Sequence, residues 1–294
     1  MLQLIRIKGD IMNRKTVLFL INGFGIERKE SYSIYDSSLM PTFDSLTKKY
    51  LFSTISSNVN NYYDGYRNAS MDIQELYNYS ILDKEIEDKK FQINPNLLKI
   101  KEEITTKKGN LHIFALADTS LKLITHLKET LKVLNPDKNQ KIFLHFIMSS
   151  NTISDYKKLA EVFSKINIEF NNIAPIGFIM GLSSIDNNAK DVDINFFFKM
   201  FISKVGEKWQ SFTQKFDVLY GTKVLPRDAK PFIVNSNFNL GKDDTFFIYN
   251  YDNIDLTKFI NTLANIRYGN DNNNFTYHSL FSVASNIKIP YMYN

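Results

Sequence analysis

The chain has 294 residues, of which 44% are hydrophobic, and 36 basic against 31 acidic side chains give it a net charge of +5. The absence of cysteine excludes disulfides, thiolate zinc sites and cysteine nucleophiles, and it fits a reducing cytoplasm. The mixed charges argue against a nucleic-acid groove, and no apolar run reaches the roughly 18 residues that span a membrane. The four histidines form no close pair, which argues against a histidine-rich metal site.

Strand-like apolar runs alternate with helical patterns along the chain. The expected strands lie at 16–21, 51–56, 111–117, 141–148, 173–181, 244–251 and 275–281. The expected helices lie at 41–49, 95–107, 120–134, 155–165, 193–216 and 255–267, and a polar loop is expected at 57–80. This alternation predicts an α/β fold with three layers, αβα, around a mostly parallel sheet.

Functional side chains in such folds gather where the parallel strands end. The residues at the expected strand ends are Asn22, Asp118, Ser149, Gly181 and Asp252. The first of these ends, in the segment "KTVLFLINGFG", has the form of a metal-binding or phosphate-binding strand end, although its polar residue carries no charge.

Six segments, taken in order, carry a resemblance to a known family. They read "LFLINGFG", "MPTFDSLTKKY", "DGYRNAS", "SILDKEIEDKKFQINPNLLKIKE", "GNLHIFALADTS" and "FIYNYDNID". Together they resemble the cofactor-independent phosphoglycerate mutases of the alkaline phosphatase superfamily, from about Lys15 to the end of the sequence.

The resemblance implies a phosphatase-like domain, which in the family holds two manganese ions and a transiently phosphorylated serine, and an inserted transferase-like domain. We expect an N-terminal extension at 1–14, a remnant of the phosphatase-like domain at 15–80 and a transferase-like α/β domain at 81–294. The sequence stops where the family's phosphatase-like domain resumes, so we expect most metal ligands to have no counterpart. Either Met1 or Met12 is the start.

The resemblance places Asn22 at the first manganese-binding aspartate and Ser70 at the nucleophilic serine. Asn22 lacks the charge that hard divalent ions favour, and Ser70 lacks the metal that activates a hydroxyl group. In the family's pattern Asp118 is retained, the substrate-facing histidine falls near Lys122, and a further arginine falls at Lys190.

The two arginines of the family's Arg-Pro-Asp-Arg motif correspond to Asp252 and Asp255. Arginine binds phosphate and carboxylate groups bidentately, so two aspartates would repel such a substrate. We therefore expect all these site positions to be vestigial in a pseudoenzyme that is not an enzyme and holds neither metal nor cofactor. Their ordinary roles would be to cap the helix at 120–134, for Asp118, and to complement a helix dipole, for the aspartate pair.

The preferred hypothesis is a non-catalytic structural or adaptor subunit of a larger cytoplasmic protein assembly, for example a motor or ATPase-type complex. Exposed rings of the expected helix at 193–216 would mark a surface for other protein subunits. Neither a nucleic-acid partner nor a membrane span is expected. Two alternatives are an active phosphomutase or phosphatase completed by another chain, and a sensor of small phosphorylated ligands.

Overall fold

The computed structural model describes residues 4–6, 17–19, 41–50, 78–117, 119–135, 141–251, 254–268 and 271–293. The chain divides into two compact units, Met1–Ile73 and Gln74–Asn294. In the first unit, β1 (Leu4–Arg6) pairs antiparallel with β2 (Val17–Phe19), and α1 spans Pro41–Lys49. The strand expected at 51–56 lies outside the described residues. No helix among the described residues combines the length and apolar character needed to cross a membrane.

A six-stranded sheet with the order β11-β7-β3-β4-β5-β6 forms the centre of the second unit. Its strands are β3 (Leu111–Ala117), β4 (Ile142–Met148), β5 (Ile176–Gly181), β6 (Phe232–Ile233), β7 (Thr245–Tyr249) and β11 (Thr276–Ser279). All neighbours are parallel except β6, which runs antiparallel to β5. Two small sheets pair β8 (Ile254–Asp255) with β12 (Val283–Ala284) and β9 (Arg267–Tyr268) with β10 (Asp271–Asn272).

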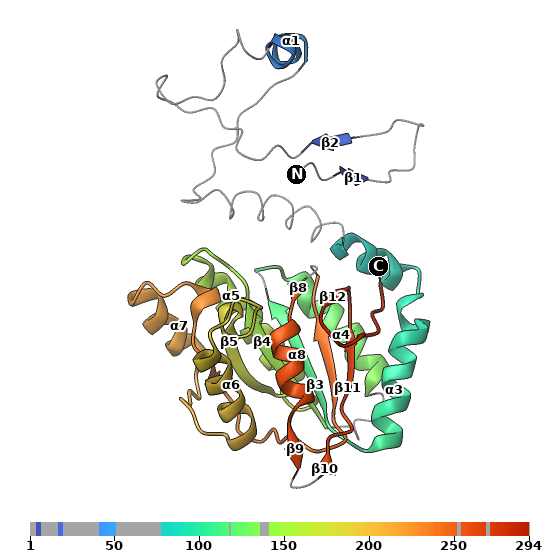
Figure 1. The fold of residues 1–294 in the computed structure, drawn as a ribbon, viewed down its shortest axis with the longest axis vertical. Helices are drawn as coiled ribbons and strands as arrows, with labels where there is room; N and C mark the ends of the chain where they lie inside the picture. The colour runs from blue at the N-terminus through green and yellow to red at the C-terminus, as the bar shows by residue number, and fades with distance from the viewer. Residues whose placement is uncertain are drawn as a thin grey trace. The chain divides into compact units, whose positions relative to one another are not determined.

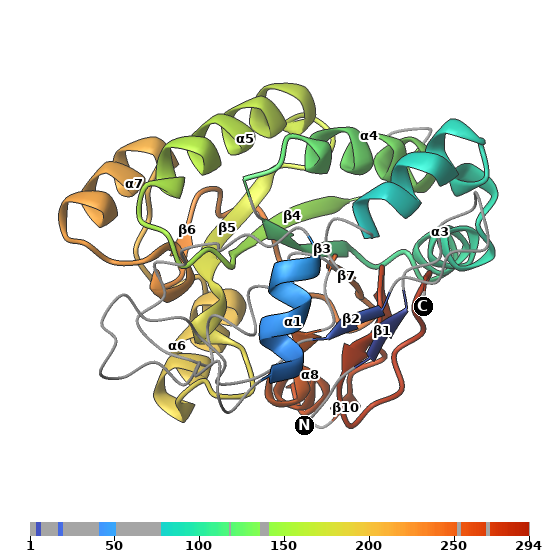
Figure 2. The same cartoon turned by 90° about the horizontal axis from the view of Figure 1, so that it is seen from above.

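Helices cover both faces of this sheet (Figures 1 and 2). They are α3 (Pro95–Lys107), α4 (Lys122–Leu134), α5 (Asp155–Phe170), α6 (Asp191–Ser203), α7 (Phe212–Gly221) and α8 (Thr257–Ala264). Residues 78–87 are also helical, and single 3-10 turns occur at η2 (Phe91–Ile93), η3 (Leu182–Ser184) and η4 (Pro226–Asp228). The expected α/β class with a mostly parallel sheet and three layers is confirmed.

The central strands are apolar throughout because both faces of the sheet are buried. In β3, Ile113 and Ala115 point into the apolar cluster beneath α3, α4, α5 and α7, whereas Phe114 and Leu116 point into the cluster beneath α6 and α8. Successive side chains alternate between the faces of a strand, so an uninterrupted apolar run is what a two-sided core requires.

The prediction of one long helix at 193–216 is wrong, because the chain forms α6 and α7 there with a break between them. Lys204 ends α6 in the left-handed conformation, with φ of 56°. A Cβ on Gly206 would lie 2.9 Å from Cγ of Met200, so the chain passes close to the helix it has just left. Ser211 then begins α7 by accepting a hydrogen bond from the backbone of Gln214. The loop expected at 57–80 is also wrong at its end, where 78–80 are helical.

Two histidines meet inside the core, although none was expected to form a close pair. His112 on β3 and His145 on β4 are completely buried on the face that α6 covers, and their Nδ1 and Nε2 atoms lie 2.9 Å apart. Nε2 of His112 lies 3.1 Å from Oδ2 of the buried Asp244. With an ionised Asp244, His112 donates to this carboxylate and accepts from the Nε2–H group of His145.

In this arrangement Nδ1 of His145 carries no proton, and its lone pair has no hydrogen-bond partner. The ring stacks on Phe178 with 4.0 Å between centroids, and Gly177 lies beside the unpartnered nitrogen. A Cβ at Gly177 would lie only 2.8 Å from it, so the glycine makes room for the ring. The hydrogen-bonded chain therefore orders three side chains in an otherwise apolar layer.

The stability of the second unit should fall as the pH drops below about 6.5, the pKa of a histidine in an unfolded chain. Burial, and to a smaller extent His112, lowers the pKa of His145 well below 6.5, so only the unfolded chain gains a proton there. Burial also lowers the pKa of His126 and His278. Holding one histidine neutral lowers the free energy of unfolding by about 1 kcal/mol between pH 7 and pH 5.5.

Urea unfolding at several pH values, followed by the fluorescence of Trp209, the single tryptophan, measures this slope. The variant His145→Gln keeps an N–H donor for His112 but does not titrate, so its stability should depend less steeply on pH. An equally steep slope in the variant would contradict the assigned neutral state of His145.

Candidate functional site at the carboxyl edge of the sheet

Parallel strands β3, β4, β5 and β7 all end at one edge of the sheet, and α4, α5, η3 and α8 begin near it. Short segments that contain several polar residues follow these strand ends at 119–121, 149–154 and 182–190. Sites in open α/β sheets are found at this edge, so we place the candidate functional site here.

Arg227 in η4 ties the ends of β4 and β5 together. Its backbone N–H donates to the carbonyl of Ser150 over 3.0 Å, and its Nη1 and Nε atoms donate to Oδ1 of Asn151 over 3.1 Å and Oγ of Ser183 over 3.3 Å. Its Nη2 atom lies 3.5 Å from Oδ2 of Asp186. The side chain of Arg227 is 17% exposed, so these contacts are held largely away from water.

A close backbone contact fixes η4 against the end of β5. Gly181 donates from its N–H group to the carbonyl of Ala229 over 2.8 Å. A Cβ at Gly181 would lie 2.2 Å from the carbonyl oxygen of Arg227 and 2.7 Å from the nitrogen of Ala229. The φ of Gly181 is −88°, which any residue adopts, so the position needs glycine for space alone.

A second polar cluster joins the helical residues 78–87 to α4 and the end of β7. Asp83 lies 2.6 Å from Nζ of Lys122 and 2.9 Å from Nε2 of His126. Nδ1 of His126 lies 2.9 Å from the hydroxyl of Tyr251, whose backbone carbonyl accepts a hydrogen bond from Asn78. A neutral His126 donates to Asp83 and accepts from Tyr251, so one proton arrangement satisfies the ring.

Charge and burial set the protonation of this cluster. Partial burial of Asp83 raises its pKa, but hydrogen bonds from Lys122 and His126 outweigh this and hold the pKa below its usual value. Burial lowers the pKa of His126, and the bond to Asp83 offsets this only in part. Tyr251 is 2% exposed, so it is not open to an external substrate. The hydrogen bonds from Asp83 through His126 to Tyr251 instead hold the helical residues 78–87 in place.

The structure places only some of the predicted site residues. Asn22, Ser70, Asp118 and Asp252 lie outside the described residues. Among the described ones, Lys122 pairs with Asp83, Lys190 precedes α6 with its carbonyl bound to backbone N–H groups of the first turn, and Asp255 accepts from the backbone N–H of Thr257 over 3.0 Å. No interaction recorded within the described ranges joins these three predicted residues to one another.

The residues that organise the described edge were missed from the sequence. They are Arg227, Asp186, Asp83, His126 and Tyr251. Arg227 lies between Pro226 and Asp228, in a stretch for which no helix or strand was expected. The available signal for this site was a charged residue next to a turn-forming proline. The side-chain partners Asn151, Ser183 and Asp186 could not be read from that signal, because they lie 41 to 76 residues away in the chain.

At the described edge, the positive charge of Arg227 is already compensated by neighbouring aspartates. A phosphate group approaching Arg227 would compete with Asp186 and with Asp228, whose Oδ1 lies 3.9 Å from Nε of the arginine. In the part of the chain that the structure describes, no three His, Asp or Glu side chains are grouped to hold a metal ion. The manganese pair implied by the family therefore does not fit the described residues, and we assign no step to it.

Comparison with known proteins connects this geometry to a sequence relationship. No protein-family model matches the chain. The 2,3-bisphosphoglycerate-independent phosphoglycerate mutase of Mycoplasmopsis pulmonis (strain UAB CTIP) is 20% identical to it over 259 residues. The alignment covers 81% of this chain and 50% of the mutase, so the chain spans about half the length of the curated relative it matches. The expected resemblance is thus confirmed as a distant relationship.

The same comparison corrects the expectation that the chain is not an enzyme. The relative is an enzyme by name, and the similarity extends over most of the present chain. The expectation of inactivity used substitutions at single positions, and two of these, Asn22 and Asp252, lie outside the described residues, as do the retained Ser70 and Asp118. The relationship points to an enzyme family instead.

Replacing Gly181 with alanine should destabilise the second unit by roughly 1–3 kcal/mol, the usual cost of forcing extra atoms into a packed site. The new methyl group would collide with backbone atoms of η4 and the residue after it. Backbone atoms cannot move aside as the end of a flexible side chain can. Gly221→Ala is the matched control, because a Cβ there has no atom within 4 Å and Gly221 ends a helix. Urea unfolding of both variants tests this, and equal stabilities would contradict the close contact.

Proposed function

We propose that the chain is a subunit of a larger cytoplasmic protein assembly and that one side of α6 contacts its partner protein. The observation that carries this proposal is a sector of α6 with apolar side chains in water. Val192 is 69% exposed, Ile202 is 47% exposed and Phe196 is 40% exposed. At 100° per residue these positions share one side of the helix, roughly 120° wide, together with the exposed Lys199.

The opposite side of α6 is part of the core, which makes the exposed sector distinct. Ile194, Phe197, Met200 and Phe201 are buried on that side. Single exposed apolar residues are ordinary, whereas several on one side of a helix suit a contact with another protein. The motor or ATPase-type complex considered from the sequence is one example of such an assembly, and the absence of cysteine is in keeping with the cytoplasm.

The double variant Val192→Glu/Ile202→Lys tests the surface without changing the net charge. The new acid lies in the first turn of α6 and the new base in its last turn, so each complements the helix dipole. We expect the native partner to bind at least about tenfold more weakly, as for the loss of interface anchors. Quantitative affinity capture from native cells measures this.

The control is Ile168→Gln, which changes an 85% exposed apolar residue on α5. It should leave the captured partner in place, and thermal unfolding should show that both variants fold. A monodisperse monomer without a stoichiometric partner in native extracts, or equal capture by the α6 variant, would refute the proposed contact.

A phosphomutase or phosphatase completed by another chain is the second candidate. The similarity to a phosphoglycerate mutase favours it. The second chain would supply the metal-binding groups, and Ser70 would be the nucleophile that the resemblance places.

Manganese-dependent turnover of phosphoglycerate by the captured complex tests this candidate. Ser70→Ala should reduce turnover to background because no other hydroxyl occupies that position, whereas Thr106→Ala, on the exposed surface of α3, should leave it intact. Absence of turnover in both the isolated chain and the complex would exclude it and leave the assembly proposal unaffected.

A further inference from the structure

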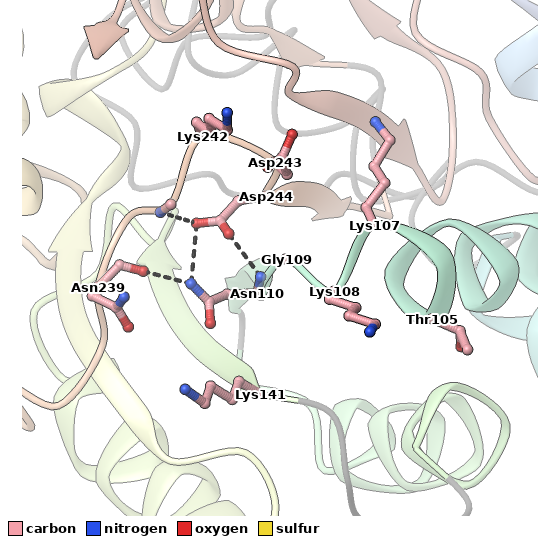
Figure 3. A pocket seen from close by; sticks show the side chains of 11 residues that line it. Thr105, Lys107, Lys108, Gly109, Asn110, Lys141, Asn239, Lys242, Asp243 and Asp244 are labelled. Carbon is pink, nitrogen blue, oxygen red and sulfur yellow. Dashed lines mark hydrogen bonds between the residues drawn. The ribbon is translucent and has the colours of Figure 1, made fainter. Parts of the chain in front are cut away.

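A hollow of about 560 Å³ lies at the opposite edge of the sheet, where the strands begin (Figure 3). The end of α3, the turn into β3, the residue before β4 and the loop before β7 surround it. Four lysines line it, namely Lys107, Lys108, Lys141 and Lys242, against two aspartates, so its lining has an excess of two positive charges. A concave surface of one charge sign concentrates oppositely charged solutes.

The floor of the hollow is held rigidly by Asp244. This buried carboxylate accepts hydrogen bonds from the backbone N–H groups of Gly241 over 2.6 Å and Asn110 over 2.7 Å. The side chain of Asn110 donates to the carbonyl of Asn239 over 3.0 Å, which fixes the adjoining wall (Figure 3). A Cβ at Gly109 would lie 2.2 Å from the carbonyl oxygen of Asp243, so the two loops touch backbone to backbone. The lysines therefore project from a fixed frame.

Among the described residues, no carboxylate forms an ion pair with the four lysines around the hollow. Lys107 donates to the backbone carbonyl of Asn274 over 3.0 Å, and the structure records no ion pair between a described carboxylate and Lys108, Lys141 or Lys242. Some lysines on the helical surfaces do pair with acids, as Lys128 does with Glu169 over 2.6 Å. Figure 3 shows the four ammonium groups apart from one another around the hollow. The flexible four-carbon stem of lysine lets such a group turn toward a ligand.

The helix dipole explains two of these lysines but not the others. Lys107 and Lys108 lie at the end of α3, where a positive charge is favourable in any case. Lys141 precedes β4, and Lys242 belongs to the loop before β7, about a hundred residues farther along the chain. No single helix end brings these two to the hollow.

We propose that the hollow binds a small phosphorylated molecule with at least two negative charges. Lysine ammonium groups bind phosphate oxygens as point charges, so they accept such a ligand without a fixed bidentate geometry. The volume is in the range of small-molecule sites, and the excess positive charge matches a dianion. This site is on the far edge of the sheet from Arg227 and does not depend on the assembly proposed above.

Isothermal titration of the full chain with inorganic pyrophosphate tests the proposal, with sodium chloride at equal ionic strength as the reference. The site variant Lys141→Gln/Lys242→Gln should raise the dissociation constant at least about tenfold. The control Lys157→Gln/Lys158→Gln removes the same charge from the exposed surface of α5 and should leave the constant unchanged.

Weaker binding at higher salt is expected for the wild-type chain, because salt screens the lysines. Thermal unfolding without pyrophosphate should show that both variants are folded. A site with a millimolar dissociation constant would be largely occupied at about 10 mM pyrophosphate. The absence of any heat of binding at this concentration would therefore overturn the proposal. Equal losses in the two variants would also overturn it, because binding would then follow net charge rather than this hollow.

Discussion

A parallel sheet has to bury both of its faces, and the architecture of residues 74–294 depends on this requirement. The strands β3 and β4 are apolar at almost every position, and their side chains alternate between two clusters. One cluster needs α3, α4, α5 and α7 as a cover, and the other needs α6 and α8 (Figure 2). Polar groups inside the layers must then bond to one another, as His112, His145 and Asp244 do.

Burying both faces leaves the two ends of the strands as the places where polar chemistry can gather. At the carboxyl edge, Arg227 and Asp83 each organise a cluster in which opposite charges lie close together. At the amino edge, Asp244 directs its oxygens inward to backbone N–H groups and to His112, while lysines face the water. The same sheet thus presents one edge with compensated charge and another with a positive excess.

The sequence predicted the elements whose signals are local. The amphipathic pattern at 95–107 predicted α3, and the unbroken apolar run at 111–117 predicted β3. The break between α6 and α7 was overlooked although Gly206 and Ser211 lie in the largely polar segment 204–211, and β6 has only two residues. The site was harder, because its contacts join distant positions. Lys122 was named as a vestigial site position, but its partner Asp83 lies 39 residues earlier, on a helix that was not expected there.

The two outer strands of the sheet limit how the protein can join other chains. On one side β6 is only two residues long and Lys208 pairs with Ile233, and on the other side Tyr291 bridges to Ser279 of β11. Each outer strand thus already meets another segment, so a visiting strand finds little free backbone along which to add. Growth of this sheet by strand addition, the route to fibrils and to many strand-mediated complexes, is disfavoured at both sides. Association is directed instead to the helical layers, where side chains rather than backbone groups select the partner.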